Sequence, residues 1–359
     1  MTNRERCIKT LLCEPTDRAP FPMWLGFAPW GETMQRWRRE SGLADLDLVK
    51  YFGFEPFFMG VPAELGPLPH FDAKVLEETP DFVVSTDWRG ITMRNRRDGH
   101  SMPEFLRHPI RTADDWARYQ AERLQPQLAA RLPRLQQFAA YAATVDAPIQ
   151  LGSFPWGVFG TVRDLMGAEE LLVAFYDAPE LVRDMMHTCT GLWLAVYEEI
   201  VKTVRVDHLH IWEDMSGRQG SLISPAMVEA FMMPEYDRFA AFTRRHGIPL
   251  LSVDSDGLVS QLVPVMMRHG MNAFLPFEVQ AGNSVEDFRR RYPKLGILGG
   301  LDKRALAQGQ PELHRELDRA ARMLALGGYV PGFDHLIPPD ASWANFRYFV
   351  EHLRRLVFG

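Results

Sequence analysis

The sequence has little of several features that mark special classes of protein. Only three cysteines, Cys7, Cys13 and Cys189, occur in 359 residues, too few and too scattered for a disulfide framework. No CxxC pair indicates a structural zinc site. No run of about 20 apolar residues could cross a membrane, and charges interrupt the apolar stretch at the start, so no secretory signal is expected. These absences predict a protein of the reducing cytoplasm.

An excess of positive charge is also lacking. The 40 Lys and Arg residues are outnumbered by 46 Asp and Glu residues, which gives a formal net charge of −6. Nucleic acids are bound by clustered basic side chains that release counterions from the phosphates. The balance therefore argues against a nucleic acid partner and favours a small-molecule substrate.

The order of apolar runs predicts a single α/β domain. Short β-rich runs alternate with amphipathic helical runs, and this alternation is typical of parallel βα units. Eight such strands close a (β/α)8 barrel, also called a TIM barrel. The predicted strands are Phe21–Trp24, Phe54–Met59, Ile149–Ser153, His208–Glu213, Pro249–Val253, Ala273–Phe277, Gly296–Gly300 and Tyr329–Phe333.

Residues 60–146 break this alternation. The stretch VVSTDWRGITMRN is typical of a β-hairpin, and two later stretches of this region are typical of helices. We expect an insertion near the barrel mouth within one domain of residues 1–359, because no linker or internal repeat divides the chain.

Acidic residues follow most of the later predicted strands. In barrels of this kind the site lies at the carboxyl ends of the strands. The acids at these ends are Glu213, Asp214, Asp254, Asp256, Glu278, Asp302 and Asp334. Converging carboxylates repel one another, so they need a cation, a cationic substrate, or a raised pKa that keeps one of them protonated.

A purely structural role competes with this interpretation. Asp is a preferred N-cap residue, so Asp302 and, to a lesser degree, Asp256 could simply cap the helices that follow them. Capping explains Asp254, Glu278 and the Asp334-His335 pair less well. These residues are therefore the stronger candidates for chemistry.

The histidines divide into two groups. His208 and His210 lie early in their strand at a spacing of two, so they share one side of it, and packed, hydrogen-bonded roles are favoured over ligand roles. His335 follows an acid at a strand end, where an imidazole could bind a metal or move a proton near neutral pH.

Aromatic side chains also gather after the early strands. Trp24 and Trp156 are candidates to stack on a flat substrate or cofactor, although large aromatics equally often just close a barrel mouth.

Four motifs resemble the uroporphyrinogen decarboxylase superfamily. They are RERCIKTLLCEPTDRAP near the start, GSFPWGVFGTVRDLMGAEELLVAFYDAPELV in the centre, and GGLDKRAL and GGYVPGFDHLIPPDASWANFRYFVE towards the end. Their order and spacing span almost the whole chain. The resemblance implies a (β/α)8 barrel that is either a decarboxylase or a methyltransferase exchanging methyl groups with corrinoid cofactors.

The chain departs from the typical decarboxylases of this superfamily. They carry arginines in an Arg-Gln-Ala-Gly-Arg stretch after the first strand and an aspartate after the second, where this chain has LGFAPW and GVPAE. An octa-anionic substrate needs fixed positive charge, so the classical reaction is not expected.

The chain also departs from the thiol methyltransferases of the superfamily, which bind zinc through a His-x-Cys-Gly motif and a later cysteine. Here the matching places have Asp254-Ser255-Asp256-Gly257 and Asp334-His335. Asp254, Asp256 and Glu278 with His335 could form an oxygen-rich site for zinc or a harder divalent metal.

The resemblance and the strand-end acids together favour a corrinoid-linked methyltransferase or demethylase acting on a small methylated substrate or a pterin. Its catalytic residues would be Asp254, Asp256, Glu213, Glu278 and His335. Asp334 would help to complete the shell around the substrate. Cobalamin would come from a separate corrinoid-binding protein, because no cobalamin-binding module is evident in the chain.

Two alternatives remain open from the sequence. A decarboxylase or lyase without metal would hold a carboxylated substrate through Arg163 and Arg218. A barrel that only binds a small molecule would leave the strand-end acids without a use. Aromatic helices at the end of the chain would also permit a homodimer.

Overall fold

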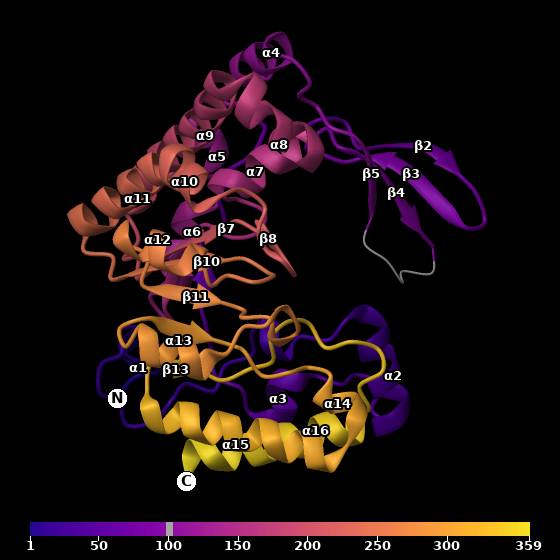
Figure 1. The fold of residues 1–359 in the computed structure, drawn as a ribbon, viewed down its shortest axis with the longest axis vertical. Helices are drawn as coiled ribbons and strands as arrows, with labels where there is room; N and C mark the ends of the chain where they lie inside the picture. Colours follow the sequence, from indigo (N-terminus) through magenta and orange to yellow (C-terminus); the bar gives the residue numbers. More distant parts are fainter. Residues whose placement is uncertain (98–102) are drawn as a thin grey trace.

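The computed structural model describes residues 1–97 and 103–359, and its centre is a curled sheet of seven parallel strands surrounded by helices (Figure 1). The strands lie side by side in chain order. They are β1 Met59–Gly60, β6 Ile149–Leu151, β7 His208–Trp212, β10 Leu250–Asp254, β11 Ala273–Leu275, β12 Gly296–Leu298 and β13 Tyr329–Val330. Each strand lies within or overlaps one of the predicted runs, which confirms the predicted α/β barrel class.

The predicted first strand, Phe21–Trp24, is wrong as a strand. It makes one isolated bridge, between Pro22 and Glu55, because prolines without an N–H cannot continue a ladder. The chain just after it contacts the other edge of the sheet, where the Phe333 N–H donates to the Gly26 carbonyl over 3.0 Å. This irregular stretch therefore joins the two edges of the sheet and closes the barrel.

The predicted second strand, Phe54–Met59, is also shorter than expected. Only a bridge at Glu55 and the two residues of β1 pair with neighbours, because Pro56 interrupts the run.

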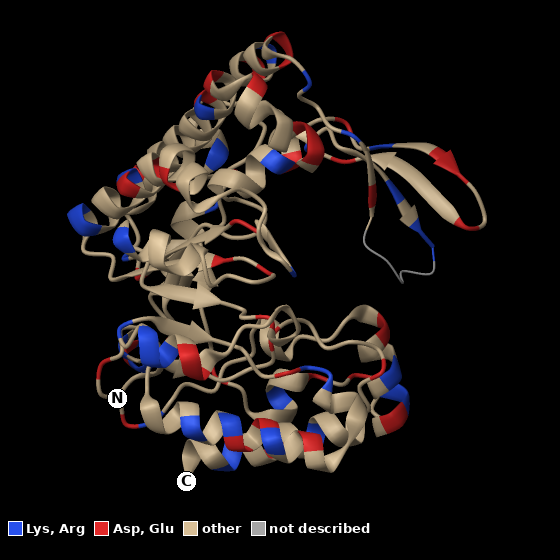
Figure 2. Ribbon diagram, in the orientation of Figure 1, with Lys and Arg blue, Asp and Glu red and all other residues tan. Residues whose placement is uncertain are grey.

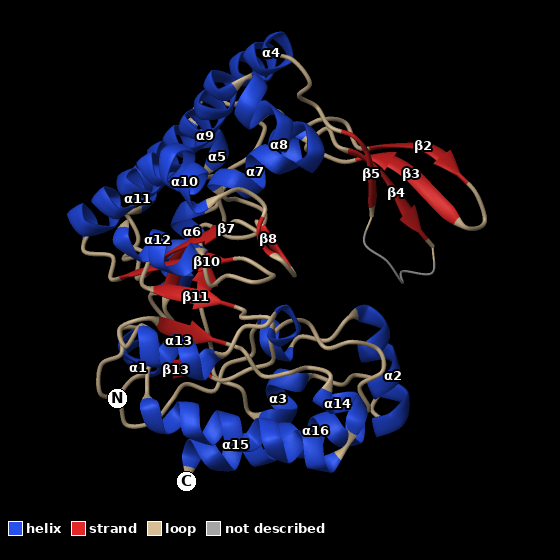
Figure 3. Ribbon diagram, viewed as in Figure 1, coloured by secondary structure: helices blue, strands red, loops and turns tan. Residues whose placement is uncertain are grey.

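Helices cover the outside of the barrel, as expected for parallel strands whose outer faces are apolar (Figure 3). The longer helices are α1 Asn3–Leu11, α2 Gly31–Ser41, α7 Val158–Met166, α8 Ala168–Asp177, α9 Pro179–Ile200, α11 Met233–His246, α15 Gln310–Leu326 and α16 Trp343–Phe358. The shorter ones are α3 Leu48–Phe52, α10 Pro225–Met227, α12 Leu262–Arg268, α13 Val285–Arg291 and α14 Ala305–Gln308. Figure 2 shows the positions of Lys, Arg, Asp and Glu along these helices and in the loops, whereas the barrel strands have few of them.

The insertion between β1 and β6 forms a four-stranded antiparallel sheet followed by helices. Its elements are β2 Lys74–Glu78, β3 Phe82–Thr86, β4 Thr92–Arg96, β5 Glu104–Arg107, α4 Ala113–Arg123, α5 Leu128–Arg131 and α6 Leu135–Ala142. The pairing of β3 with β4 confirms the predicted hairpin. Residues 98–102 of the predicted insertion lie outside the described residues. Figure 1 shows this sheet on the side towards which the barrel strands point.

Two arginines hold the insertion in place, one by bonds within it and one by a bond to the barrel. Arg131 is completely buried and donates to four carbonyls, including those of Glu64 and Gly66. Arg89 pairs with Asp164 of α7 over 2.5 Å.

Among the described helices, none is long and apolar enough to cross a membrane.

Candidate active site

A cavity of about 300 Å³ lies inside the barrel. Barrels of this type normally fill their interior with layers of side chains, so an empty space of this size is unusual. It falls at the lower end of the range for small-molecule sites. The lining residues are Leu11, Met23, Trp24, Leu25, Phe57, Phe58, Gln150, His208, His210, Ser252, Asp254, Leu275 and Leu298.

One side of the cavity carries a polar network from two neighbouring strands. Ser252 on β10 lies opposite His210 on β7 in the sheet register. The Ser252 hydroxyl contacts Nε2 of His208 over 2.6 Å and Nδ1 of His210 over 2.7 Å. This confirms that the two histidines are packed and hydrogen-bonded. Burial lowers the pKa of His208 well below its ordinary value and that of His210 to about 4, so both imidazoles are neutral at pH 7.

Asp254 ends β10 and lines the same cavity, two residues beyond Ser252 and on the same side of the strand. Its carboxyl group has no hydrogen bond or ion pair with any residue that the structure describes. Burial, reinforced by the nearby carboxylates of Asp256 and Asp214, raises its pKa well above the usual range. This environment therefore favours the protonated form of Asp254, which faces the space where a ligand would lie.

A second acidic group surrounds Lys303, beyond the end of β12. The Lys303 Nζ lies 3.5 Å from Oε1 of Glu278 and 4.0 Å from Oδ1 of Asp334. The buried Asp334 also accepts the backbone N–H groups of Val279 and Lys303, over 2.9 and 3.2 Å. Burial raises the pKa of Asp334 to about 6, although Lys303 acts against this shift. An internal ammonium group thus neutralises part of the predicted acid cluster.

His335 and Asp256 form a looser pair at the same mouth, with Nε2 and Oδ2 3.5 Å apart. Burial, and then Lys303, lowers the pKa of His335, so its imidazole is mainly neutral at pH 7. Burial, and then Glu278, raises the pKa of Asp256 to about 7. The contact at neutral pH is therefore between a neutral imidazole and a carboxyl group that is about half protonated, rather than a full ion pair.

Glu213 has a different environment from the other candidates. Its carboxyl group is fully buried and accepts the N–H groups of Val158, Phe159 and Gly160 at the start of α7, over 2.7 to 3.2 Å. It also accepts the Tyr236 hydroxyl over 2.8 Å. Burial raises its pKa to about 7, although these four hydrogen bonds act to lower it. Glu213 caps α7 here, and its acceptor positions are already occupied.

The two predicted substrate-binding arginines lie outside the cavity. Arg163 pairs with Asp214 over 2.8 Å and lies over the Trp212 ring. Arg218 is exposed in the tight hairpin between β8 Ser216–Gly217 and β9 Gly220–Ser221. No Lys or Arg is among the described residues that line the cavity.

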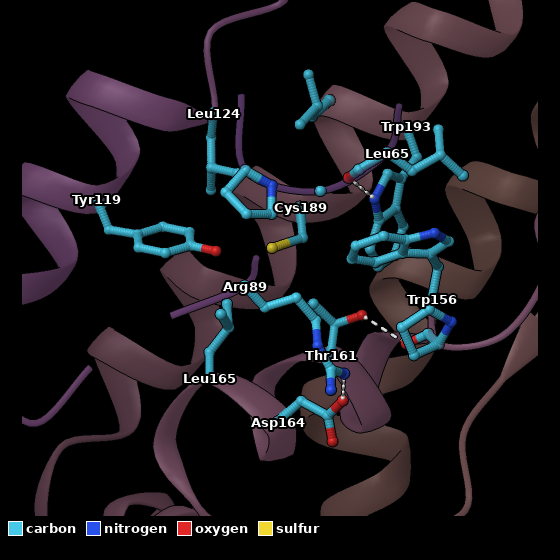
Figure 4. Close-up of a pocket in the computed structure, with 14 residues that line it drawn as sticks. Leu65, Arg89, Tyr119, Leu124, Trp156, Thr161, Asp164, Leu165, Cys189 and Trp193 are labelled. Atoms are coloured by element: carbon cyan, nitrogen blue, oxygen red, sulfur yellow. Dashed lines mark hydrogen bonds and ion pairs between the residues drawn. The ribbon is translucent and has the colours of Figure 1, made fainter. Parts of the chain in front are cut away.

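The two predicted substrate-binding tryptophans are separated. Trp24 lines the barrel cavity and donates to the Pro331 carbonyl over 3.0 Å. Gly332 permits this approach, because a Cβ there would lie 2.5 Å from the indole. Trp156 instead lines a smaller pocket beside the insertion, of about 20 Å³, together with Trp193 and the Arg89–Asp164 pair (Figure 4). That space suits about one water molecule.

The acid cluster does not fit a metal ion as it stands. Within residues 1–97 and 103–359, no three His, Cys, Asp or Glu side chains are arranged to hold one. Glu278 and Asp334 face Lys303, whose ammonium group already supplies a positive charge. The divalent metal stays a prediction.

Gln150 and Ser252 were not predicted as site residues from the sequence, and His208 and His210 were predicted as packed, hydrogen-bonded residues rather than as part of a cavity lining. The available signal was the presence of polar residues within the apolar runs of three adjacent strands, β6, β7 and β10, because side chains at alternate strand positions face the barrel interior together.

Comparison with known proteins gives a family and a fold. The family model for uroporphyrinogen decarboxylase matches residues 70–356. A methyltransferase from Methanosarcina mazei has a similar structure, with a TM-score of 0.63 and 16% sequence identity, over 99% of this chain and 99% of that chain. At this identity the likeness concerns the fold alone. A search of curated proteins gives no match.

Proposed function

We propose that this chain, which belongs to the uroporphyrinogen decarboxylase family, is a methyltransferase that demethylates a small substrate bound inside the barrel. The observation that carries the proposal is Asp254, an unpartnered carboxyl group at the end of β10 that faces a ligand-sized cavity. A separate corrinoid-binding protein would supply the cobalt that accepts the methyl group.

Asp254 would act as the general acid. When the bond between the methyl carbon and its oxygen breaks, the electron pair stays on the oxygen, which needs a proton to leave as a hydroxyl group. The protonated carboxyl group would donate that proton. Asp256 and Asp214 then disfavour the carboxylate that remains, so Asp254 would regain a proton from solvent before the next turnover.

The remaining predicted residues would support this step from the mouth. Asp256, whose pKa is about 7, stands beside the imidazole of His335, and this pair would return the proton to Asp254. Glu278 and Asp334 would hold Lys303, and with it the loop that follows β12. Glu213 would act only by fixing α7.

The decarboxylase alternative is weaker on this geometry. A carboxylated substrate needs a fixed cation at its binding site. Lys303 is engaged with Glu278 and Asp334, and Arg163 with Asp214. The described cavity lining contains neither lysine nor arginine.

The test uses the purified chain with reduced cobalamin as methyl acceptor and three classes of methyl donor: an aryl methyl ether, a quaternary ammonium compound and a thioether. Cobalamin methylation is followed by absorbance. Methylation by any donor, dependent on the protein, supports the proposal. Release of carbon dioxide from carboxylated analogues without any methyl transfer would contradict it.

A further inference from the structure

The cavity lining combines an apolar wall with a few polar atoms that have no protein partner. The wall includes Trp24, Phe57 and Phe58, and Phe58 packs on His208 with ring centroids 4.1 Å apart. Polar atoms in such a setting are costly unless a ligand pairs with them. Whether these atoms are donors or acceptors therefore indicates which polar groups the ligand carries.

The hydrogen positions in the His208–Ser252–His210 network follow from its contacts. Ser252 has one hydroxyl hydrogen and touches one ring nitrogen of each histidine. Nδ1 of His208 is buried without any partner among the described residues. A buried N–H without an acceptor is rarer than an unpaired lone pair, so this nitrogen carries no hydrogen.

This leaves one consistent arrangement. Nε2–H of His208 donates to the Ser252 oxygen, and the Ser252 hydroxyl donates to Nδ1 of His210. If both histidines donated to Ser252, its own hydrogen would be left unpaired in a buried position. Nε2 of His210 therefore carries a hydrogen and has no acceptor among the described residues. It is a hydrogen-bond donor for a ligand.

The other polar groups of the lining narrow the ligand class. Nε2 of Gln150 donates to the Gly152 carbonyl over 2.9 Å, which leaves its side-chain oxygen as an acceptor. Asp254 offers a second donor when protonated. A cation would place its charge beside the Nε2–H of His210 and leave that donor unpaired, and an anion would find no lysine or arginine in the described lining.

Size limits the ligand further. A cavity of 150 Å³ lined by apolar side chains is known to hold benzene, so about 300 Å³ accommodates one substituted aromatic ring but no tetrapyrrole. The aromatic wall suits a flat ring, which stacks or packs edge-on against Trp24, Phe57 and Phe58.

We infer that the barrel cavity binds an uncharged single-ring aromatic compound through a hydrogen-bond-accepting oxygen, with the Nε2–H of His210 as the recognising donor and Ser252 as its positioning residue. This inference rests on the proposed function only for the statement that the bound ligand is the methyl donor. An aryl methyl ether would place its oxygen between His210 and Asp254, which both line the cavity.

The binding test needs no methyl transfer, so its outcome is independent of the proposed reaction. Methoxybenzene, benzoate and benzylammonium share one ring and differ in charge. Their affinities for the full chain are measured at pH 7 by calorimetry or ligand-observed NMR. Methoxybenzene is expected to bind at least tenfold more tightly than either ion. Equal or tighter binding of benzoate or benzylammonium overturns the inference.

A second measurement tests the role of His210 and Ser252. Long-range ¹H–¹⁵N spectra should show both His208 and His210 as Nε2–H tautomers, and methoxybenzene should shift the Nε2 signal of His210. Ser252→Ala should mix the tautomers and weaken methoxybenzene binding about three- to tenfold, whereas Ser260→Ala, at an exposed serine, should change neither. A His210 found as the Nδ1–H tautomer in the wild-type chain would also overturn the inference.

Discussion

Nζ of Lys303 lies 3.5 Å from Oε1 of Glu278, within a group of carboxyl groups that would otherwise repel one another. The sequence suggested a cation, a cationic substrate or a raised pKa as ways to hold these acids together. The structure contains two of the three. Lys303 provides an internal cation, and Asp254, Asp256 and Asp334 have raised pKa values.

Replacing this ammonium group gives the first prediction. Lys303→Met should lower the free energy of unfolding by about 1–3 kcal/mol at pH 8, because Glu278 and the buried Asp334 lose their partner. The loss should shrink towards pH 5, where Asp334, with its pKa of about 6, is mostly protonated. Urea unfolding at both pH values measures this. Arg304→Met, at a half-exposed arginine that pairs with Asp302, should cost no more than about 1 kcal/mol at either pH.

Asp256 gives the second prediction. Its pKa is about 7 in the folded chain and about 4 when unfolded, so the folded state binds the proton more tightly. Stability is therefore lost as the pH rises from about 4 to about 7. Asp256→Asn should remove this loss. It should raise the free energy of unfolding by about 1–2 kcal/mol at pH 8 and by little at pH 4, a range that allows for the partial exposure of the side chain. Melting temperatures that change equally at both pH values would disprove the assignment.

The fold could be predicted well where apolar runs are continuous. Runs such as IPLLSV and LGILGG can only be strands buried on both faces, and they form β10 and β12. The first predicted strand failed because Pro20 and Pro22 cannot donate ladder hydrogen bonds, although the run is apolar. The sequence alone does not show that two isolated bridges, Pro22 with Glu55 and Pro29 with Ile337, and a few loop contacts suffice to close the barrel.

The site could be predicted only in part. The place of Asp254 in the site could be predicted from its position at a strand end. In the structure its carboxyl group is unpaired and faces the cavity. Glu213 has the same sequence signal, yet it is turned towards the amide groups of α7. Which acid faces the cavity depends on side-chain direction and on helix placement. Neither can be read from strand order.

Glu213 gives the third prediction. Glu213→Gln should destabilise the chain by about 2–4 kcal/mol, because the amide replaces a carboxylate that accepts three backbone N–H groups and the Tyr236 hydroxyl. Tyr236→Phe, which removes one of these bonds, should cost about 1 kcal/mol. Chemical denaturation measures both changes. Wild-type stability of Glu213→Gln together with lost activity would instead mean that Glu213 takes part in the chemistry.

His210 gives the fourth prediction. The imidazole has a pKa of about 4 in the folded chain and about 6.5 when unfolded, so the unfolded chain binds the proton more tightly. Stability should fall as the pH drops from about 6.5 to about 4, by roughly 3 kcal/mol from this residue. His210→Gln should flatten this part of the stability curve. NMR titration of the His210 ring with a midpoint near 6.5 would contradict the account.

The central claim, that Asp254 is the proton donor inside a substrate cavity, is tested most directly by single-turnover methyl transfer from methoxybenzene to reduced cobalamin. Asp254→Asn should lower the rate by about 10²- to 10⁴-fold while methoxybenzene affinity changes by less than about threefold. Asp302→Asn, at the end of another strand but paired with Arg304, should react like the wild type. Equal rates for Asp254→Asn and the wild type would contradict the claim.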